Sequence, residues 1–125
     1  MAALLRGQLA VAQRDADGAL TAFTGVQIPG VLDDLYAAGV ADVDLGVSFA
    51  KAKPTFRLWA PTAQSATLLT YDPSTGSGTS TGSGTSTGSG TGAIRHEATY
   101  DPASGVWTVA GGKELKGDEY LWEVV

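Results

Sequence analysis

The residues that could carry hydrolase chemistry in this sequence do not form a catalytic pattern. Two matches to Gly-x-Ser-x-Gly occur, at 78–82 and 84–88. In hydrolases this pattern works because a strained strand-to-helix turn presents the serine to a histidine base. Here both copies belong to one tandem repeat, and no helix is predicted after them, so we assign neither serine as a nucleophile. The missing strand-turn-helix context and the absence of a following lysine also exclude a phosphate-binding glycine loop.

The sequence offers neither a set of metal ligands nor a pair of residues for acid–base catalysis. His96 is the single histidine and the chain has no cysteine, which leaves too few partners for a zinc site. Glycoside hydrolysis needs two carboxylates facing one sugar. Asp33 and Asp34 are adjacent and point to different faces, and the other acidic candidates lie in or beside predicted turns: Asp101, Glu114, Glu119 and Glu123. We therefore predict no catalytic residue, no metal site and no cofactor, and a chain that is not an enzyme by itself.

The aromatic side chains are the remaining ligand candidates. Sugar rings stack on exposed indole or phenol faces, so a β-module with a flat aromatic residue can hold a glucan. We name Trp59, Tyr71 and Trp107 as the candidate carbohydrate-binding residues. The competing interpretation is packing, because strand alternation places Trp107 on one face with Val109 and places Trp122 on the core face of the last strand.

The amino-acid composition argues against two classes of binding partner, nucleic acids and membranes. Eight Lys and Arg against 13 Asp and Glu give a net charge of -5, so no basic stripe exists to neutralise nucleic acid or an anionic membrane surface. No apolar run approaches the ~20 residues that span a bilayer. The first residues lack the basic and apolar pattern of a signal peptide. Absence of cysteine leaves the compartment open.

The first part of the chain predicts a β-hairpin and a short helix. Residues 4–28 contain two alternating runs joined by the turn signal Asp15-Ala-Asp17-Gly18, which is a better interpretation than a calcium loop with missing ligands. Pro29-Gly30 should end the second strand. Residues 31–38 can form two helical turns, which Gly39 is placed to terminate.

The second part predicts a β-sandwich. Short runs of strand-forming residues, separated by Pro, Gly or Asp, occupy 43–49, 55–59, 65–71, 93–100, 106–109 and 119–125. Between Ser74 and Gly92 a Gly/Ser/Thr repeat contains nothing to bury, which predicts a disordered loop. We divide the chain into residues 1–45, the end of a preceding β-domain with a connector, and residues 46–125, the sandwich with its loop at 74–92.

Two sets of residues resemble a known family. Phe56-Arg-Leu-Trp59-Ala-Pro61-Thr-Ala63, with Gly105-Val-Trp107 and Tyr120-Leu-Trp-Glu-Val124, is similar to the N-terminal module of glycoside hydrolase family 13. That module is an early-set immunoglobulin-like sandwich, also called carbohydrate-binding module family 48. The stretch from Thr24 to Ala37, with Asp44 to Phe49 after it, resembles the segment that enters this module in bacterial pullulanases.

The resemblance implies an accessory fragment of an extracellular or cell-envelope enzyme that cleaves α-1,6-glucosidic branches in pullulan and starch. The family's catalytic carboxylates lie in a (β/α)8 barrel, and no position here matches them. The implied role is packing against that catalytic domain in the same polypeptide; the alternative is weak α-glucan binding.

The chain departs from the family pattern in two places. Glucan-binding members carry a tryptophan where this chain has Asp72-Pro73 and the repeat. The resemblance also implies further strands after Val125, so we expect an incomplete sandwich and a start inside the preceding domain.

Overall fold

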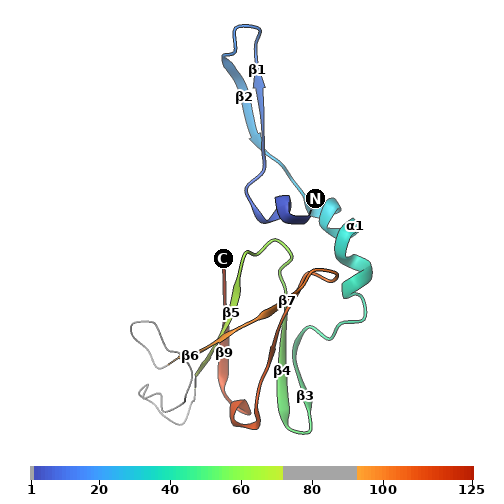
Figure 1. Cartoon of the computed structure of the whole chain (residues 1–125), viewed down its shortest axis with the longest axis vertical. Helices are drawn as coiled ribbons and strands as arrows, with labels where there is room; N and C mark the ends of the chain where they lie inside the picture. The colour runs from blue at the N-terminus through green and yellow to red at the C-terminus, as the bar shows by residue number, and fades with distance from the viewer. Residues whose placement is uncertain (1, 72–92) are drawn as a thin grey trace.

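The computed structural model describes residues 2–71 and 93–125. The predicted disordered loop at 74–92 lies outside these residues. The described part is mainly β-structure, which confirms the predicted all-β class (Figure 1). No helix within the described ranges is long and apolar enough to cross a membrane.

The first region projects from the rest of the molecule as a two-stranded hairpin (Figure 1). Strands β1 (Ala10–Arg14) and β2 (Leu20–Gly25) pair antiparallel, and a short 3-10 helix, η1 (Ala2–Arg6), precedes them. The hairpin is confirmed, but the prediction of a strand through Leu5 is wrong. Leu5 belongs to η1 and is buried, so a tertiary contact has overridden the local alternation.

The hairpin turn forms as its residues predict. The Asp15 carboxylate oxygen Oδ1 accepts hydrogen bonds from the backbone N–H of Asp17 at 3.0 Å and of Ala19 at 2.8 Å. Gly18 has φ +83°, a conformation that glycine adopts without strain. The Asp15 side chain therefore serves the backbone of its own turn.

Helix α1 (Pro29–Val40) is longer than predicted at both ends. The prediction that Pro29-Gly30 ends the second strand is wrong, because β2 already ends at Gly25. Pro29 instead lies in the first turn of the helix, where a missing N–H costs nothing. The prediction that Gly39 terminates the helix is wrong. A Cβ at Gly39 would lie 2.5 Å from the Ala103 carbonyl oxygen, so the glycine allows the helix to approach residues 101–105 closely.

In the described residues after α1, seven strands form two antiparallel sheets. Their bounds are β3 (Gly46–Ala50), β4 (Lys53–Trp59), β5 (Ala66–Tyr71), β6 (Ile94–Glu97), β7 (Thr99–Asp101), β8 (Val106–Ala110) and β9 (Glu119–Val124). One sheet has the order β3-β4-β8-β7 and the other β6-β5-β9. A second 3-10 helix, η3 (Lys113–Leu115), leads into β9. Strand β4 begins at Lys53 and includes Pro54, which we had predicted to lie outside it.

The predicted single strand at 93–100 is two strands in different sheets. Strand β6 pairs with β5, and β7 pairs with β8. The chain changes sheet at Ala98, whose N–H donates to the Ala66 carbonyl oxygen at 3.0 Å. Ala98 packs against both groups of core residues, so its small side chain lies where the chain passes from one sheet to the other.

The core lies between the two sheets. One group contains Phe56, Leu68, Val109 and Leu115, and the other contains Ala63, Ala66 and Trp107. Trp122 packs against both groups, which agrees with its predicted place on the core face of the last strand. The two facing layers make the described residues 46–71 and 93–125 a β-sandwich.

Candidate functional site

The best-organised polar and aromatic cluster joins the N-terminal segment to the sandwich. The Arg6 guanidinium carbon lies 4.0 Å from the Tyr100 ring centroid and 5.7 Å from that of Trp107. A guanidinium over an aromatic face within about 6 Å is attracted by the ring quadrupole. The Tyr100 and Trp107 rings are themselves 4.9 Å apart. We call Arg6, Tyr36, Tyr100 and Trp107 the junction cluster.

Helix α1 enters the junction cluster through Tyr36, which is 2 % exposed. The Tyr100 hydroxyl donates to the Pro61 carbonyl oxygen at 3.4 Å, and the Tyr36 hydroxyl lies 3.5 Å from that of Tyr100. The hydrogen bond with Tyr100, followed by burial, raises the pKa of Tyr36. Tyr36 is therefore held in its neutral form and links helix α1 to Tyr100 of strand β7.

The turn at 101–105 supports the same junction. Asp101 accepts hydrogen bonds from the Ala103 N–H at 3.1 Å and from the Ser104 hydroxyl at 2.5 Å. The bond from Ser104, then the one from Ala103, holds the pKa of Asp101 below its usual value. Gly105 has φ +72°, and a Cβ there would lie 2.6 Å from the Pro61 side chain. A glycine is thus required where the turn meets Pro61.

The three predicted carbohydrate-binding residues do not come together. Trp59 and Trp107 lie on neighbouring strands, but the register pairs Trp107 with Leu58, so the two indoles project from opposite faces of the sheet. Tyr71 lies at the end of β5 in the other sheet. No shared sugar platform is formed by these residues.

Two of the three are engaged inside the protein. Trp107 is 6 % exposed, and its indole N–H donates to the Ala60 carbonyl oxygen at 2.9 Å. Trp59 is half-buried, and its indole N–H donates to the Ser104 carbonyl oxygen at 3.0 Å. A stacking residue needs an open ring face, so we do not carry Trp107 into any binding proposal.

Tyr71 retains access to solvent. With Glu119, Tyr120 and Leu121 it lines an open cavity of about 410 Å³. Glu119 is paired with Tyr71 across the two strands, and both project from the outer face of the sheet. This cavity combines a phenol ring with a carboxylate.

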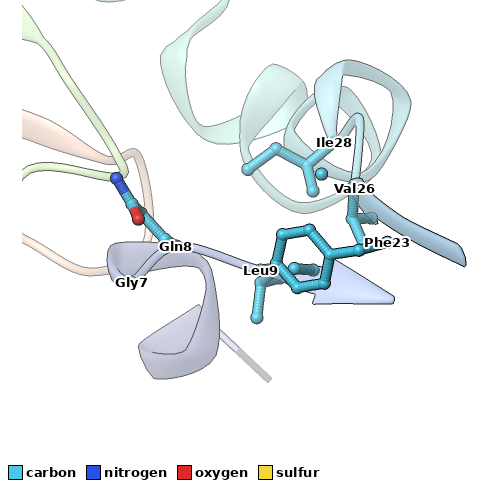
Figure 2. A pocket seen from close by; sticks show the side chains of 8 residues that line it. Gly7, Gln8, Leu9, Phe23, Val26 and Ile28 are labelled. Atoms are coloured by element: carbon cyan, nitrogen blue, oxygen red, sulfur yellow. The ribbon is translucent and has the colours of Figure 1, made fainter. Parts of the chain in front are cut away.

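A second cavity lies at the base of the hairpin (Figure 2). Its volume is about 370 Å³, and its lining includes Leu9, Phe23, Val26 and Ile28. In Figure 2 these apolar side chains gather together, whereas the Gln8 amide points away from them. Phe23 is 68 % exposed, so this is an open apolar surface rather than a polar site.

The titratable candidates have structural partners. His96 Nε2 lies 3.1 Å from the hydroxyl of Thr70, which is 1 % exposed. Glu123 pairs with Arg95, which lowers the pKa of the carboxyl group. Among the residues that the structure describes, no group of three or more His, Cys, Asp or Glu is placed to hold a metal ion.

Arg6 and Tyr36 are the contributors that sequence reasoning missed. Arg6 lies in a run that alternates like a strand, which gives no sign that its side chain crosses to the sandwich. Tyr36 has the same helical spacing as Leu32 and Leu35, yet it alone of the three is buried, and Leu35 is 41 % exposed. Both roles depend on contacts with residues far away in the sequence.

Comparison with known proteins gives a consistent set of relatives. Residues 1–34 match the model of the pullulanase N2 domain. The chain is 37% identical over 119 residues to a pullulanase of Klebsiella pneumoniae, covering 95% of this chain and 10% of that protein. It is 44% identical over 68 residues to the chloroplastic pullulanase 1 of Arabidopsis thaliana, covering 54% of this chain and 7% of that one.

Solved structures that superpose on this chain are also pullulanases. The apo pullulanase of Klebsiella pneumoniae superposes with a TM-score of 0.77 at 35% identity, over 97% of this chain and 11% of that one. The PulA structure from Klebsiella oxytoca gives a TM-score of 0.77 at 34% identity, over 97% of this chain and 10% of that one. The chain thus spans about a tenth of the length of these bacterial relatives. The resemblance to the N-terminal region of pullulanases is confirmed.

Proposed function

This chain corresponds to the N-terminal region of a pullulanase, and we propose that it is a non-catalytic accessory segment of an α-1,6-glucan debranching hydrolase. Its partner is the catalytic (β/α)8 barrel of the same polypeptide, against which it packs. The parent enzyme acts on pullulan and starch outside the cell or in the cell envelope. The sandwich is the immunoglobulin-like module of carbohydrate-binding family 48 within glycoside hydrolase family 13.

The observation that carries the accessory role is the burial of the tryptophan and tyrosine side chains. All three tryptophans and all four tyrosines are buried or half-buried, and the junction cluster uses three of these seven to hold the first region on the sandwich. A binding or catalytic module presents such groups to its substrate. Here they fix the arrangement of two segments, as a positioning element requires.

The carboxylates support the same proposal. Among those with resolved contacts, Asp101 caps a turn, Asp15 serves the hairpin turn and Glu123 is paired with Arg95. A glycosidase needs one carboxylic acid and one carboxylate facing the same bond. We find no such pair in the part of the chain that the structure describes.

Pullulan hydrolysis tests the non-catalytic assignment. We expect no reducing-sugar release by this chain above that of a buffer blank. Release that disappears on replacing a single carboxylate, for example Glu119→Gln, would contradict it. Asp33→Asn, at an exposed helix position, serves as the matched control.

The cavity beside Tyr71 favours a second candidate, weak α-glucan binding. Tyr71 can stack on a sugar ring and Glu119 can accept hydrogen bonds from its hydroxyls. An NMR titration with maltotriose distinguishes the two functions. Glucan binding predicts saturable shifts around the cavity beside Tyr71 that Tyr71→Ala removes and Asp33→Asn retains, since Asp33 lies on α1 and does not line that cavity. The accessory role predicts no saturable shift.

A further inference from the structure

The lysines of this chain gather at one end of the sandwich. They are Lys51, Lys53, Lys113 and Lys116. The first two lie at the turn that joins β3 to β4, and the other two lie in η3 and directly after it. Figure 1 shows this turn and the segment that leads into β9 at the end of the sandwich away from α1. The two pairs are far apart in the sequence, so the basic end exists only in the folded chain.

Packing behind the lysines holds the turn and η3 together. The Gly111 N–H donates to the Pro54 carbonyl oxygen at 2.9 Å. A Cβ at Gly111 would lie 2.9 Å from the Pro54 side chain and 3.0 Å from that of Leu115, so a larger residue would not fit between the two segments. Pro54 is fully buried and Leu115 is 6 % exposed. Lys53 precedes Pro54 and Lys116 follows Leu115, so each pair is anchored directly on the core.

Local geometry turns the lysine side chains outward. Pro54 faces the core, so strand alternation places Lys53 on the outer face. The Lys116 N–H donates to the Lys113 carbonyl oxygen at 3.2 Å, and residues three apart in a 3-10 turn lie on the same side of it. All four lysines are exposed, and none of them takes part in an ion pair within residues 2–71 and 93–125. Their charges are therefore open to a partner.

The turn that presents Lys51 is strained. Ala50 pairs with Lys53, which leaves Lys51 and Ala52 as a two-residue turn. Their φ angles are +50° and +64°. Asn-Gly adopts such angles readily, whereas other residues do so at a cost in stability. Backbone strain that persists in a fold points to a use for the side chain it presents, which here is a lysine at the tip of the hairpin.

The basic end differs in charge from the rest of the chain. Residues 51–53 and 113–119 carry the four lysines against Glu114, Asp118 and Glu119, a local charge of +1. The remainder carries four arginines against ten acidic side chains, a charge of -6. An extended polyanion, such as nucleic acid or an anionic membrane, would be repelled by that remainder. Charges interact over only about 8 Å at physiological ionic strength, so a short anionic segment on the lysines would escape the repulsion.

We propose that these four lysines form a docking site for a short carboxylate-rich segment of a protein. The inference does not rest on the accessory function. Lysine ammonium groups act as flexible point charges, which suits separate carboxylates. Alternate residues of an extended segment are about 7 Å apart and project from one face, so Asp or Glu at alternate positions would meet the lysines together. Exposed charge pairs of this kind bind weakly and respond strongly to salt.

An NMR titration of the 125-residue chain tests the proposal. The probe is a blocked peptide of alternating glutamate and glycine, and the control peptide has glutamine in place of glutamate. We expect saturable shifts at residues 51–53 and 113–116 with the glutamate peptide only, lost when NaCl rises from about 20 mM to about 300 mM. Replacing both Lys51 and Lys53 by Gln should weaken binding roughly fivefold. Arg14→Gln on the hairpin, the matched control, should change it less than about twofold.

Ala52→Gly separates strain from charge, because it relieves the turn and retains all four lysines. It should raise the melting temperature by a few degrees and leave peptide affinity within about twofold. A lower melting temperature would contradict the assignment of strain to this turn. Absence of saturable shifts at residues 51–53 and 113–116, or equal weakening by Arg14→Gln, would overturn the docking site. Tighter binding to phosphatidylglycerol vesicles or to an oligothymidylate than to the peptide would overturn the choice of a protein segment as the occupant.

Discussion

The hairpin and the sandwich use the same alternating sequence pattern with opposite results. Every residue of β1 and β2 is exposed, including Val11 at 58 % and Phe23 at 68 %. Strand β5 alternates between buried and half-buried residues, and its Leu68 is fully buried. Alternation therefore predicts a strand, but burial requires a second layer. The described residues supply that layer for β4, β5 and β8 and leave the hairpin and the inner face of β3 open.

The largest expected contrast comes from truncating one apolar residue in each region. Leu68→Ala should lower the free energy of unfolding by about 2–5 kcal/mol, because it leaves a cavity between the sheets. Phe23→Ala should change it by less than about 0.5 kcal/mol, as surface substitutions usually do. Urea denaturation followed by tryptophan fluorescence measures both. Equal losses would show that the hairpin is covered in solution.

The junction cluster tests whether the two regions are joined by specific contacts. Arg6→Ala removes the guanidinium from the Tyr100 and Trp107 rings and should cost about 1–2 kcal/mol of unfolding free energy. Arg14→Ala is the matched control, since Arg14 reaches only the Gly18 carbonyl oxygen within its own hairpin. Its expected cost is under about 0.5 kcal/mol. Similar losses of unfolding free energy for the two arginine variants would contradict the conclusion that the junction cluster joins the two regions by specific contacts.

The smallest effect concerns acid sensitivity at the junction. The bonds from Ser104 and Ala103 lower the folded-state pKa of Asp101 from its usual 3.8. The stabilisation is therefore present above about pH 4 and is lost as pH falls through the folded-state pKa. Asp101→Asn should flatten the stability-against-pH curve in that window, whereas Asp33→Asn on α1 should not. Thermal melts from pH 7 to pH 2 measure the curves. If the Asp101→Asn variant loses as much stability below pH 4 as the unmodified chain does, the role of this carboxylate would be contradicted.

Local chemistry was sufficient to predict much of the fold. The Asp15 to Gly18 turn, the short helix, and the core face of Trp122 all follow from features within a few residues. The errors occur where distant contacts decide. Leu5 is buried in η1 and Arg6 packs on the Tyr100 ring of the sandwich, whereas Gly39 stays in its helix, with Ala103 lying against it. The sheet change at Ala98 had no local signal, since residues on both sides alternate normally.

The candidate site was harder to predict for the same reason. Trp59, Tyr71 and Trp107 have the right chemistry for sugar binding, but no short-range pattern shows that two of them donate their indole N–H groups to backbone carbonyls nearly fifty residues away. The junction cluster brings together residues from η1, α1, β7 and β8. Only the assembled sheets reveal it.

The central claim is that the tryptophan and tyrosine residues of this chain serve packing and do not bind glucan. Affinity electrophoresis through gels with and without soluble starch or pullulan tests it most directly. The account predicts that the chain migrates at the same rate in both gels relative to an inert reference protein, and that Tyr71→Ala behaves as the unmodified chain does. Retardation that increases with glucan concentration and is abolished by Tyr71→Ala would contradict the claim and establish the cavity beside Tyr71 as a glucan-binding site.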